Sequence, residues 1–200
     1  MSEIWLEPPF NMLISGVTNC GKTHYVMELL KTVYKNKFDY VVIFCPTFIE
    51  NKTYNQTFIY DDDDIIILIV NDNLNALLLV ATEVYKGSNT LFIIDDCANL
   101  HDSKIKCSQL TNLAFSGRHL GISTWVITQK YNSVVKDYRE NIRMLVLYYN
   151  KDDSALQLAL KENNVLEKSE VRNEVIQYIK NNKSSKIIMK LEHPYNYILC

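Results

Sequence analysis

The stretch Gly16-Val17-Thr18-Asn19-Cys20-Gly21-Lys22-Thr23 decides the fold, because its pattern G-x-x-x-x-G-K-T is that of a phosphate-binding P-loop. It contains two of the five glycines of the chain. An apolar run at 12–14 precedes it, and a helical pattern follows it. That pattern places on one helix face the residues Tyr25, Val26, Leu29, Leu30 and Val33. A strand, a loop and a helix in this order predict a nucleotide-binding site.

Each part of this loop has an expected role. The backbone N–H groups of a P-loop surround the β-phosphate, and the N-terminus of the next helix adds partial positive charge. We expect Gly16 and Gly21 to take backbone angles that a side chain would forbid. Lys22 would contact the β- and γ-phosphates, and Thr23 would offer its hydroxyl to Mg²⁺. The expected nucleotide-binding residues are Gly16, Val17, Thr18, Asn19, Cys20, Gly21, Lys22, Thr23 and His24.

The length of the chain bounds its organisation. Two hundred residues predict one P-loop domain over 1–200, with a core at about 10–150 and helices and an edge strand at about 151–200. The composition, 48% hydrophobic and 22% charged, is typical of globular proteins. No apolar run approaches the roughly 18 residues of a membrane span, and the acidic first residues do not resemble a secretory signal. We therefore expect no membrane span.

The cysteines indicate the redox compartment of the protein, and the net charge limits the size of any nucleic-acid-binding surface. The five cysteines are scattered and form no C-x-x-C pair, which favours free thiols in a reducing, intracellular compartment. The formal net charge is −2, from 21 basic and 23 acidic residues. Any nucleic-acid-binding surface must therefore be a local patch.

Strand and helix patterns alternate along the chain, which predicts an α/β fold with a mainly parallel central sheet flanked by helices on both faces. The expected strands are 11–15, 40–44, a buried run at 65–70, 91–94, 122–128, 144–149 and an edge strand at 187–191. The expected helices follow the P-loop to about Lys35 and then cover 74–85, 104–116, 153–163 and 167–181, with a further short helix between the strands at 122–128 and 144–149. Asp72 is expected to cap the helix at 74–85, with Gly87 as its stop. The stretch 46–64 has no clear pattern, and its four aspartates at 61–64 predict a solvated turn.

Two acids follow the apolar run 91–94. Asp95 closes that run, and four apolar residues before an acid have the Walker B form that holds the Mg²⁺ of a P-loop enzyme. Asp96 comes next, where hydrolysing P-loop enzymes of the RecA-like branch often have a Glu that orients the attacking water. An Asp can accept a proton from water if the backbone brings it close enough. Alternatively, Asp96 supports the metal site from outside, without binding the metal itself.

A third motif, Gly117-Arg118-His119-Leu120-Gly121-Ile122, leads into a strand that ends in Thr128-Gln129. The amide of Gln129 can hydrogen-bond both a γ-phosphate and a water, so it can sense whether the γ-phosphate is present. The motif contains two more of the five glycines.

These motifs resemble those of the FtsK/HerA superfamily of DNA-pumping ATPases. The matching features are Gly-Arg, two residues, Gly-Ile, a strand ending in Thr-Gln, and Asn141-Ile142-Arg143-Met144 at the next strand. The small size and the pair Asp95-Asp96 are similar to the genome-packaging ATPases of poxviruses and related large DNA viruses, virophages and Polinton/Maverick elements. The resemblance covers about residues 10–150.

The resemblance implies a RecA-like (ASCE) ATPase that assembles into a homo-oligomeric ring, a pentamer or hexamer. The ring would use ATP to move double-stranded DNA into a preformed capsid, with a capsid or portal vertex protein as partner, in the host cytoplasm or the virion. Carried over by position, Lys22 binds phosphates, Thr23 and Asp95 bind Mg²⁺, Asp96 is the catalytic acid and Gln129 is the sensor.

Arg118 and Arg143 are the implied candidates for an arginine finger given to a neighbouring subunit, which stabilises transition-state charge. Arg118 is preferred because it precedes the sensor strand. The alternative for either arginine is a surface salt bridge. DNA phosphates would need basic partners, for which Lys104, Lys106, Lys130 and Lys136 are candidates.

Two other functions share the P-loop. A nucleoside or nucleotide phosphotransferase would also show an Arg-dense lid, whereas the late helices here are rich in Asn, Glu and Lys. A nucleotide-binding assembly module with little hydrolysis would be consistent with the short side chain of Asp96.

Overall fold

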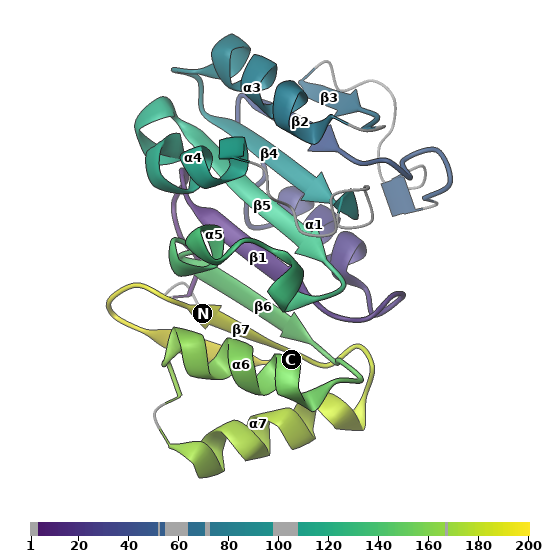
Figure 1. Ribbon diagram of the computed structural model, residues 1–200, viewed down its shortest axis with the longest axis vertical. Coiled ribbons are helices and arrows are strands. Elements are labelled where there is room, and N and C mark those ends of the chain that lie inside the picture. The colour runs from purple at the N-terminus through teal and green to yellow at the C-terminus, as the bar shows by residue number, and fades with distance from the viewer. Residues whose placement is uncertain (1–3, 52, 55–63, 71–72, 98–107, 167) are drawn as a thin grey trace.

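Eight strands form one sheet in the part of the chain that the structure describes, residues 4–51, 53–54, 64–70, 73–97, 108–166 and 168–200. The computed structural model places helices on both faces of this sheet (Figure 1). The strand order is β3-β2-β4-β5-β1-β6-β7-β8, parallel as far as β6 and antiparallel beyond it. The strands are β1 Asn11–Ser15, β2 Tyr40–Phe44, β3 Ile65–Leu68, β4 Thr90–Asp95, β5 Ile122–Thr128, β6 Met144–Tyr148, β7 Lys186–Lys190 and β8 Asn196–Leu199.

The two faces of the sheet carry different helices (Figure 1). Helix α1 (Lys22–Lys31) packs on one face, together with buried side chains of 4–10 and with Tyr54. The other face is covered by α3 Leu74–Tyr85, α4 Ser108–Ser116, α5 Lys136–Glu140, α6 Asp153–Asn163 and α7 Ser169–Asn181. Two short 3₁₀ helices, η2 (Gly117–Leu120) and η3 (Tyr131–Ser133), flank β5. The α/β fold class with helices on both faces is confirmed.

The central strands are apolar throughout because both of their faces are buried. In β4, Phe92 and Ile94 pack under α3 and α4, while Leu91 and Ile93 pack on the side of α1. Successive side chains of a strand point to opposite faces, so a strand covered on both sides has no polar face to show. This explains why the continuous apolar runs of the sequence predicted the parallel strands.

A buried polar cluster fixes β1 against β5. The Thr124 hydroxyl donates to Asn11 Oδ1 at 2.6 Å, and the Tyr138 hydroxyl donates to the Thr124 carbonyl at 2.7 Å. The amide of Asn11 also donates to the Ala114 carbonyl at 3.1 Å. Because buried polar groups need partners, this cluster ties two strands and two helices to one register.

Three strand and cap expectations were wrong. The strand expected to be buried at 65–70 is the half-buried edge strand β3, and it ends at Leu68. Asn73 caps α3 by accepting from the Ala76 N–H at 3.1 Å, and Asp72 lies outside the described residues. The late strand is interior, because β8 pairs with its far side and forms the edge.

Several boundaries also differ. Helix α1 ends at Lys31, short of the expected Lys35, and the chain turns there, with the Tyr34 N–H bonded to the Leu29 carbonyl. Helix α4 is described from Ser108, and residues 104–107 of the expected helix lie outside the described part. The same holds for 61–63 of the aspartate run, while Asp64 is an exposed turn residue. Among the described helices, none is long and apolar enough to cross a bilayer.

Gly121 is expected to be much less tolerant of alanine than Gly87, which has a similar backbone. Both have left-handed φ angles, +75° and +89°. A Cβ on Gly121 would lie 2.6 Å from the Ser88 carbonyl oxygen, whereas a Cβ on Gly87 would meet no atom within 4 Å. Gly87→Ala should therefore cost only the left-handed penalty of about 1–2 kcal/mol. Gly121→Ala should lower the free energy of unfolding by at least about 1 kcal/mol more, measured by urea denaturation. Equal losses would contradict the steric explanation.

Candidate nucleotide-binding site

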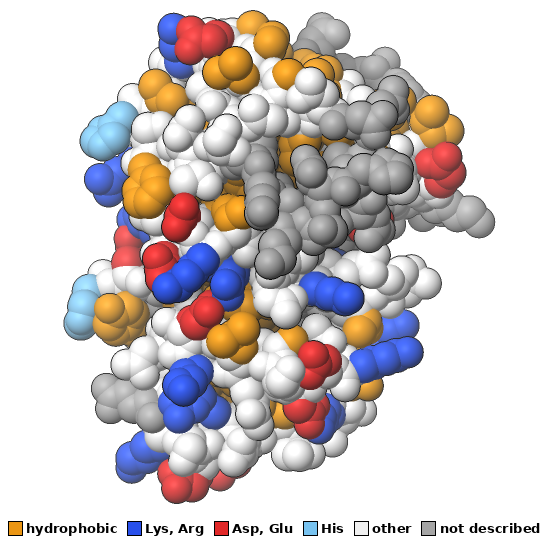
Figure 2. All heavy atoms as spheres, viewed as in Figure 1, with side chains coloured by type: hydrophobic (Ala, Val, Ile, Leu, Met, Phe, Trp, Pro, Cys, Tyr) orange, Lys and Arg blue, Asp and Glu red, His pale blue; other side chains and the backbone are white. Residues whose placement is uncertain are grey.

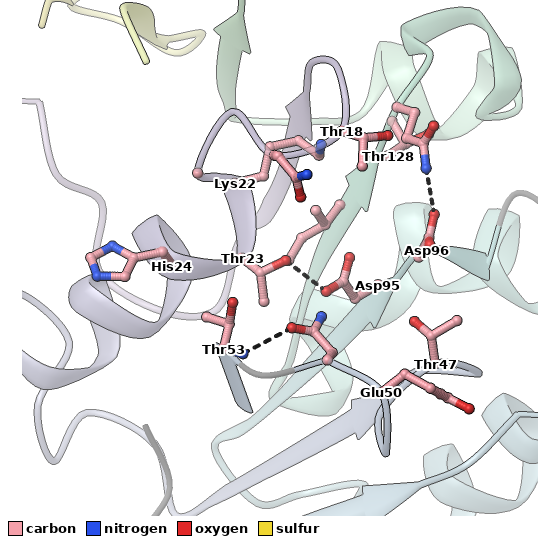
Figure 3. Close-up of a pocket in the computed structure, with 15 residues that line it drawn as sticks. Thr18, Lys22, Thr23, His24, Thr47, Glu50, Thr53, Asp95, Asp96 and Thr128 are labelled. Carbon is pink, nitrogen blue, oxygen red and sulfur yellow. Dashed lines mark hydrogen bonds between the residues drawn. The ribbon is translucent and has the colours of Figure 1, made fainter. Parts of the chain in front are cut away.

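Three neighbouring strands bring the predicted motifs to one edge of the sheet. β5 lies between β4 and β1, and the register pairs Ser15 with Thr128 and Asp95 with Ile127. A cleft of about 560 Å³ opens at these carboxyl ends (Figure 3). Its lining consists of Thr18, Asn19, Gly21, Lys22, Thr23, His24, Thr47, Glu50, Asn51, Thr53, Asp95, Asp96, Ile127, Thr128 and Gln129.

The two glycines of the P-loop serve different purposes. Gly21 precedes α1 with a φ of +99°, as expected for a residue in the left-handed region. Gly16 has no such φ. A Cβ at Gly16 would lie 2.5 Å from Tyr148 Cβ and 3.0 Å from Cys20 Sγ, so close packing against β6 requires the glycine. The expectation of a forbidden backbone angle was therefore right for Gly21 and wrong for Gly16.

Lys22 is folded back on its own loop. Its ammonium donates to the carbonyls of Gly16 at 2.8 Å and Val17 at 2.9 Å. Gly16, Val17 and Cys20 were expected to bind the nucleotide, but they are not among the residues that line the cleft. Burial raises the pKa of the Cys20 thiol. His24 lies at the side of the cleft, turned away from the carboxylates (Figure 3).

Thr23 and Asp95 meet across the cleft. The Thr23 hydroxyl donates to Asp95 Oδ2 at 2.9 Å. Asp95 is only 4% exposed, and burial raises the pKa of its carboxyl, while hydrogen bonds from Tyr54 and Thr23 act against that rise. A hydroxyl and a carboxylate are the hard oxygen ligands that Mg²⁺ prefers, and a cation would offset the buried charge. The pair fits a Mg²⁺ ion.

Asp96 and Gln129 are also brought together. The Gln129 side-chain amide donates to Asp96 Oδ1 at 3.1 Å (Figure 3). Asp96 has a φ of +53°, an uncommon value for a non-glycine residue, and it turns its carboxylate into the cleft. Asp96 and Gln129 are therefore joined directly, although they lie 33 positions apart in the sequence.

The two candidate finger arginines lie at the opposite edge of the sheet. Arg118 is exposed on η2 before β5, and Arg143 precedes β6. Strand β5 spans roughly 20 Å, so neither arginine reaches the P-loop of its own chain. Both line a hollow of about 300 Å³ at the amino edge. Arg143 is already engaged there, because its Nε donates to Glu192 at 2.6 Å and its Nη1 donates to the Pro9 carbonyl at 3.3 Å.

Sequence reasoning missed one wall of the cleft. Thr47, Glu50, Asn51 and Thr53 line it, and the Tyr54 hydroxyl donates to Asp95 at 2.7 Å. All five lie in the stretch 46–64, whose lack of hydrophobic periodicity gave no signal. The position of this stretch after β2, which neighbours β4, was the one available hint.

Solved structures with a similar fold include viral packaging ATPases. The DNA-packaging ATPase B204 from Sulfolobus turreted icosahedral virus superposes with a TM-score of 0.70 at 15% identity, covering 97% of this chain and 98% of that one. B204 from Sulfolobus turreted icosahedral virus 2 in complex with ATP-gammaS gives 0.66 at 17% identity, covering 97% and 98%. The RecA-like P-loop fold is thus shared.

Proteins that are similar to this chain in sequence are named DNA packaging proteins. The DNA packaging protein OPG160 of Variola virus is 28% identical over 151 residues, which cover 71% of this chain and 54% of that protein. OPG160 of Vaccinia virus (strain Copenhagen) is 28% identical over 149 residues, covering 70% and 53%. The chain spans about half the length of these curated relatives. The family described as poxvirus A32 protein matches residues 2–194, and the chain therefore belongs to the poxvirus A32 protein family.

Proposed function

We propose that this chain is an ATPase that moves double-stranded DNA into a viral capsid. The observation that carries the proposal is the convergence of Lys22, Thr23, Asp95, Asp96 and Gln129 on one cleft. Further support comes from relatives named DNA packaging protein and from a B204 structure that contains ATP-gammaS. Expected locations are the host cytoplasm, with its reducing conditions, and the virion.

Each side chain has a role in this mechanism. Lys22 leaves the carbonyls of Gly16 and Val17 to contact nucleotide phosphates. Thr23 and Asp95 hold Mg²⁺, which supplies positive charge to the phosphates when it is bound. Asp96 accepts a proton from the attacking water. Gln129 exchanges its bond with Asp96 for one with the γ-phosphate, which frees the carboxylate.

The catalytic site requires a second copy of the chain. Arg118 is exposed at the amino edge, whereas the cleft opens at the carboxyl edge. A ring of identical subunits, a pentamer or hexamer, would place Arg118 of one copy at the cleft of the next. An arginine supplied in this way contributes about 10³–10⁵-fold to rate in other P-loop enzymes. The same ring would dock on a capsid or portal vertex protein.

DNA contacts in this proposal use local basic residues. Lys130 and Lys136 are exposed close to the sensor strand, and Lys136 also pairs with Glu140 at 3.2 Å. Lys104 and Lys106 lie outside the described residues. Lys and Arg side chains are interspersed with acids on the face in Figure 2.

We also propose that 1–200 works as one ATPase domain, since one sheet includes strands from both the core and the last fifty residues.

ATP hydrolysis should rise more steeply than linearly with protein concentration and should increase with double-stranded DNA, because each active site needs a neighbour. Lys22→Ala should reduce phosphate release by at least about 100-fold, since it removes the ammonium from the transferred phosphate. The measurement is steady-state phosphate release at increasing protein concentration. Lys31→Ala, at the exposed end of α1, is the control and should match the wild type.

Two outcomes would overturn the proposal in different directions. Phosphate transfer to a nucleoside, with no response to DNA, would identify a phosphotransferase. Tight ATP binding without phosphate release, at every concentration and with DNA present, would identify a nucleotide-binding assembly module.

Asp96→Asn should lower kcat by about 10²–10⁴-fold while ATP binding is retained, because the amide cannot accept the proton of the water. Gln129 would still find a hydrogen-bond acceptor at this position. Single-turnover hydrolysis and equilibrium ATP binding separate the two effects. The exposed Asp64→Asn is the matched control. Wild-type turnover by Asp96→Asn would exclude it as the proton acceptor.

Mixing two inactive variants should restore activity. Lys22→Ala has a defective cleft but still presents Arg118, and Arg118→Ala has an intact cleft. In mixed rings some intact clefts receive an arginine, so the mixture should hydrolyse ATP at least about tenfold faster than either variant alone. Recovery with Arg143→Ala in place of Arg118→Ala would identify Arg143 as the finger. A lack of recovery in both mixtures would rule out a finger from the neighbour.

A further inference from the structure

One residue outside the recognised motifs contacts the metal acid directly. The Tyr54 hydroxyl donates to Asp95 Oδ2 at 2.7 Å, and the same oxygen accepts from Thr23 at 2.9 Å. Within the described residues, no donor is recorded at Oδ1. A carboxylate has two oxygens and about four acceptor sites, so this arrangement leaves the second oxygen for other ligands.

Tyr54 is itself firmly held. Its side chain is 0% exposed, and its ring stacks on Phe48 with the centroids 5.1 Å apart and an angle of 26° between the planes. Its N–H bonds to the Asn51 carbonyl at 3.2 Å. A donor with a fixed ring and a fixed backbone can fix the carboxylate that it contacts, because little freedom remains at either end.

We propose that Tyr54 is a positioning residue for the metal-binding acid: it orients the Asp95 carboxylate and links it to the cleft wall at 47–54. This inference rests on the proposed Mg²⁺-dependent ATPase function. Asn51 and Thr53 line the cleft and belong to that wall. Binding of a metal ion at Asp95 would therefore restrain this wall through the Tyr54 hydroxyl.

The size of the effect follows from comparable sites. Hydrogen bonds to an ionised carboxylate are stronger than those between neutral groups. Loss of such a partner behind a metal ligand typically weakens metal binding about 10–100-fold. The alternative is that Tyr54 has only a structural role, in which its ring fills the core beside Phe48. In that case, removing its hydroxyl would leave the affinity for the metal unchanged.

Tyr54→Phe keeps the ring and removes the hydroxyl. We expect it to raise, by about tenfold or more, the Mg²⁺ concentration that half-saturates the increase in binding of a fluorescent ADP analogue. Binding of the same analogue in EDTA should equal that of the wild type. The control is Tyr25→Phe, because the buried Tyr25 hydroxyl has no hydrogen-bond partner in the described structure. This variant should keep the wild-type Mg²⁺ requirement.

The outcomes separate the two ideas. If Mg²⁺ does not change nucleotide binding by the wild type, the proposed Mg²⁺-dependent function fails, and the role of Tyr54 fails with it. If the wild type responds and Tyr54→Phe has the same Mg²⁺ requirement, only the role of Tyr54 is overturned.

A measurement on the wild type covers the case in which Tyr54→Phe does not fold. The Thr53 N–H bonds to Asn51 Oδ1 at 3.1 Å, and it reports on the wall. With saturating ADP, added Mg²⁺ should slow hydrogen exchange of the Thr53 and Tyr54 amides severalfold, because the metal fixes Asp95 and hence Tyr54. Unchanged exchange at both amides would overturn the proposal.

Discussion

The burial of the Asp95 carboxyl is the constraint on which the site depends. A carboxyl that is 4% exposed is costly to ionise without compensation, because burial removes the hydration of its charged form. In the described structure the compensation comes from two hydroxyls, Thr23 on α1 and Tyr54 on the wall after β2. Both donate to one oxygen of Asp95, which connects α1, the end of β4 and the cleft wall. A Mg²⁺ ion would complete this compensation, and under the proposed function metal binding would therefore be coupled to the packing of the cleft wall.

The order of the strands turns three distant motifs into one site. Parallel strands present their carboxyl ends at the same edge, which is where ligands bind in open α/β sheets. Because β5 lies between β1 and β4, Gln129 emerges between the P-loop and the two acids. The buried bonds of Asn11, Thr124 and Tyr138 hold β1 and β5 in register. A slip of one residue would turn Gln129 to the other face of the sheet, away from Asp96.

The sequence predicted what is encoded locally and missed what depends on distant partners. The P-loop, the acid at the end of a buried strand and the amide at the end of the next were visible, because each places a required chemistry after a continuous apolar run. The packing reason for Gly16 was not visible, since it depends on Tyr148 of β6. Strand β8 was missed because it is a four-residue edge strand in which Tyr197 and Leu199 are exposed, so it lacks the continuous apolar run of the central strands. Tyr54 was missed because a tyrosine in a stretch without periodicity carries no motif.

The two arginines at the amino edge differ in the partners that they already have. A residue that serves a neighbouring site must be free to leave its own chain. Arg143 donates to both Glu192 and the Pro9 carbonyl, and redirecting it would leave a half-buried carboxylate without its partner. Arg118 is exposed on a one-turn helix, and no ion pair with it is recorded in the described part of the chain. Its backbone is nevertheless anchored, because Gly117 packs against the Ile122 carbonyl and Gly121 against Ser88. A fixed backbone with an uncommitted guanidinium suits an arginine finger, so under the proposed ring mechanism Arg118 is the better candidate, whereas the bonds of Arg143 connect it to its own amino edge.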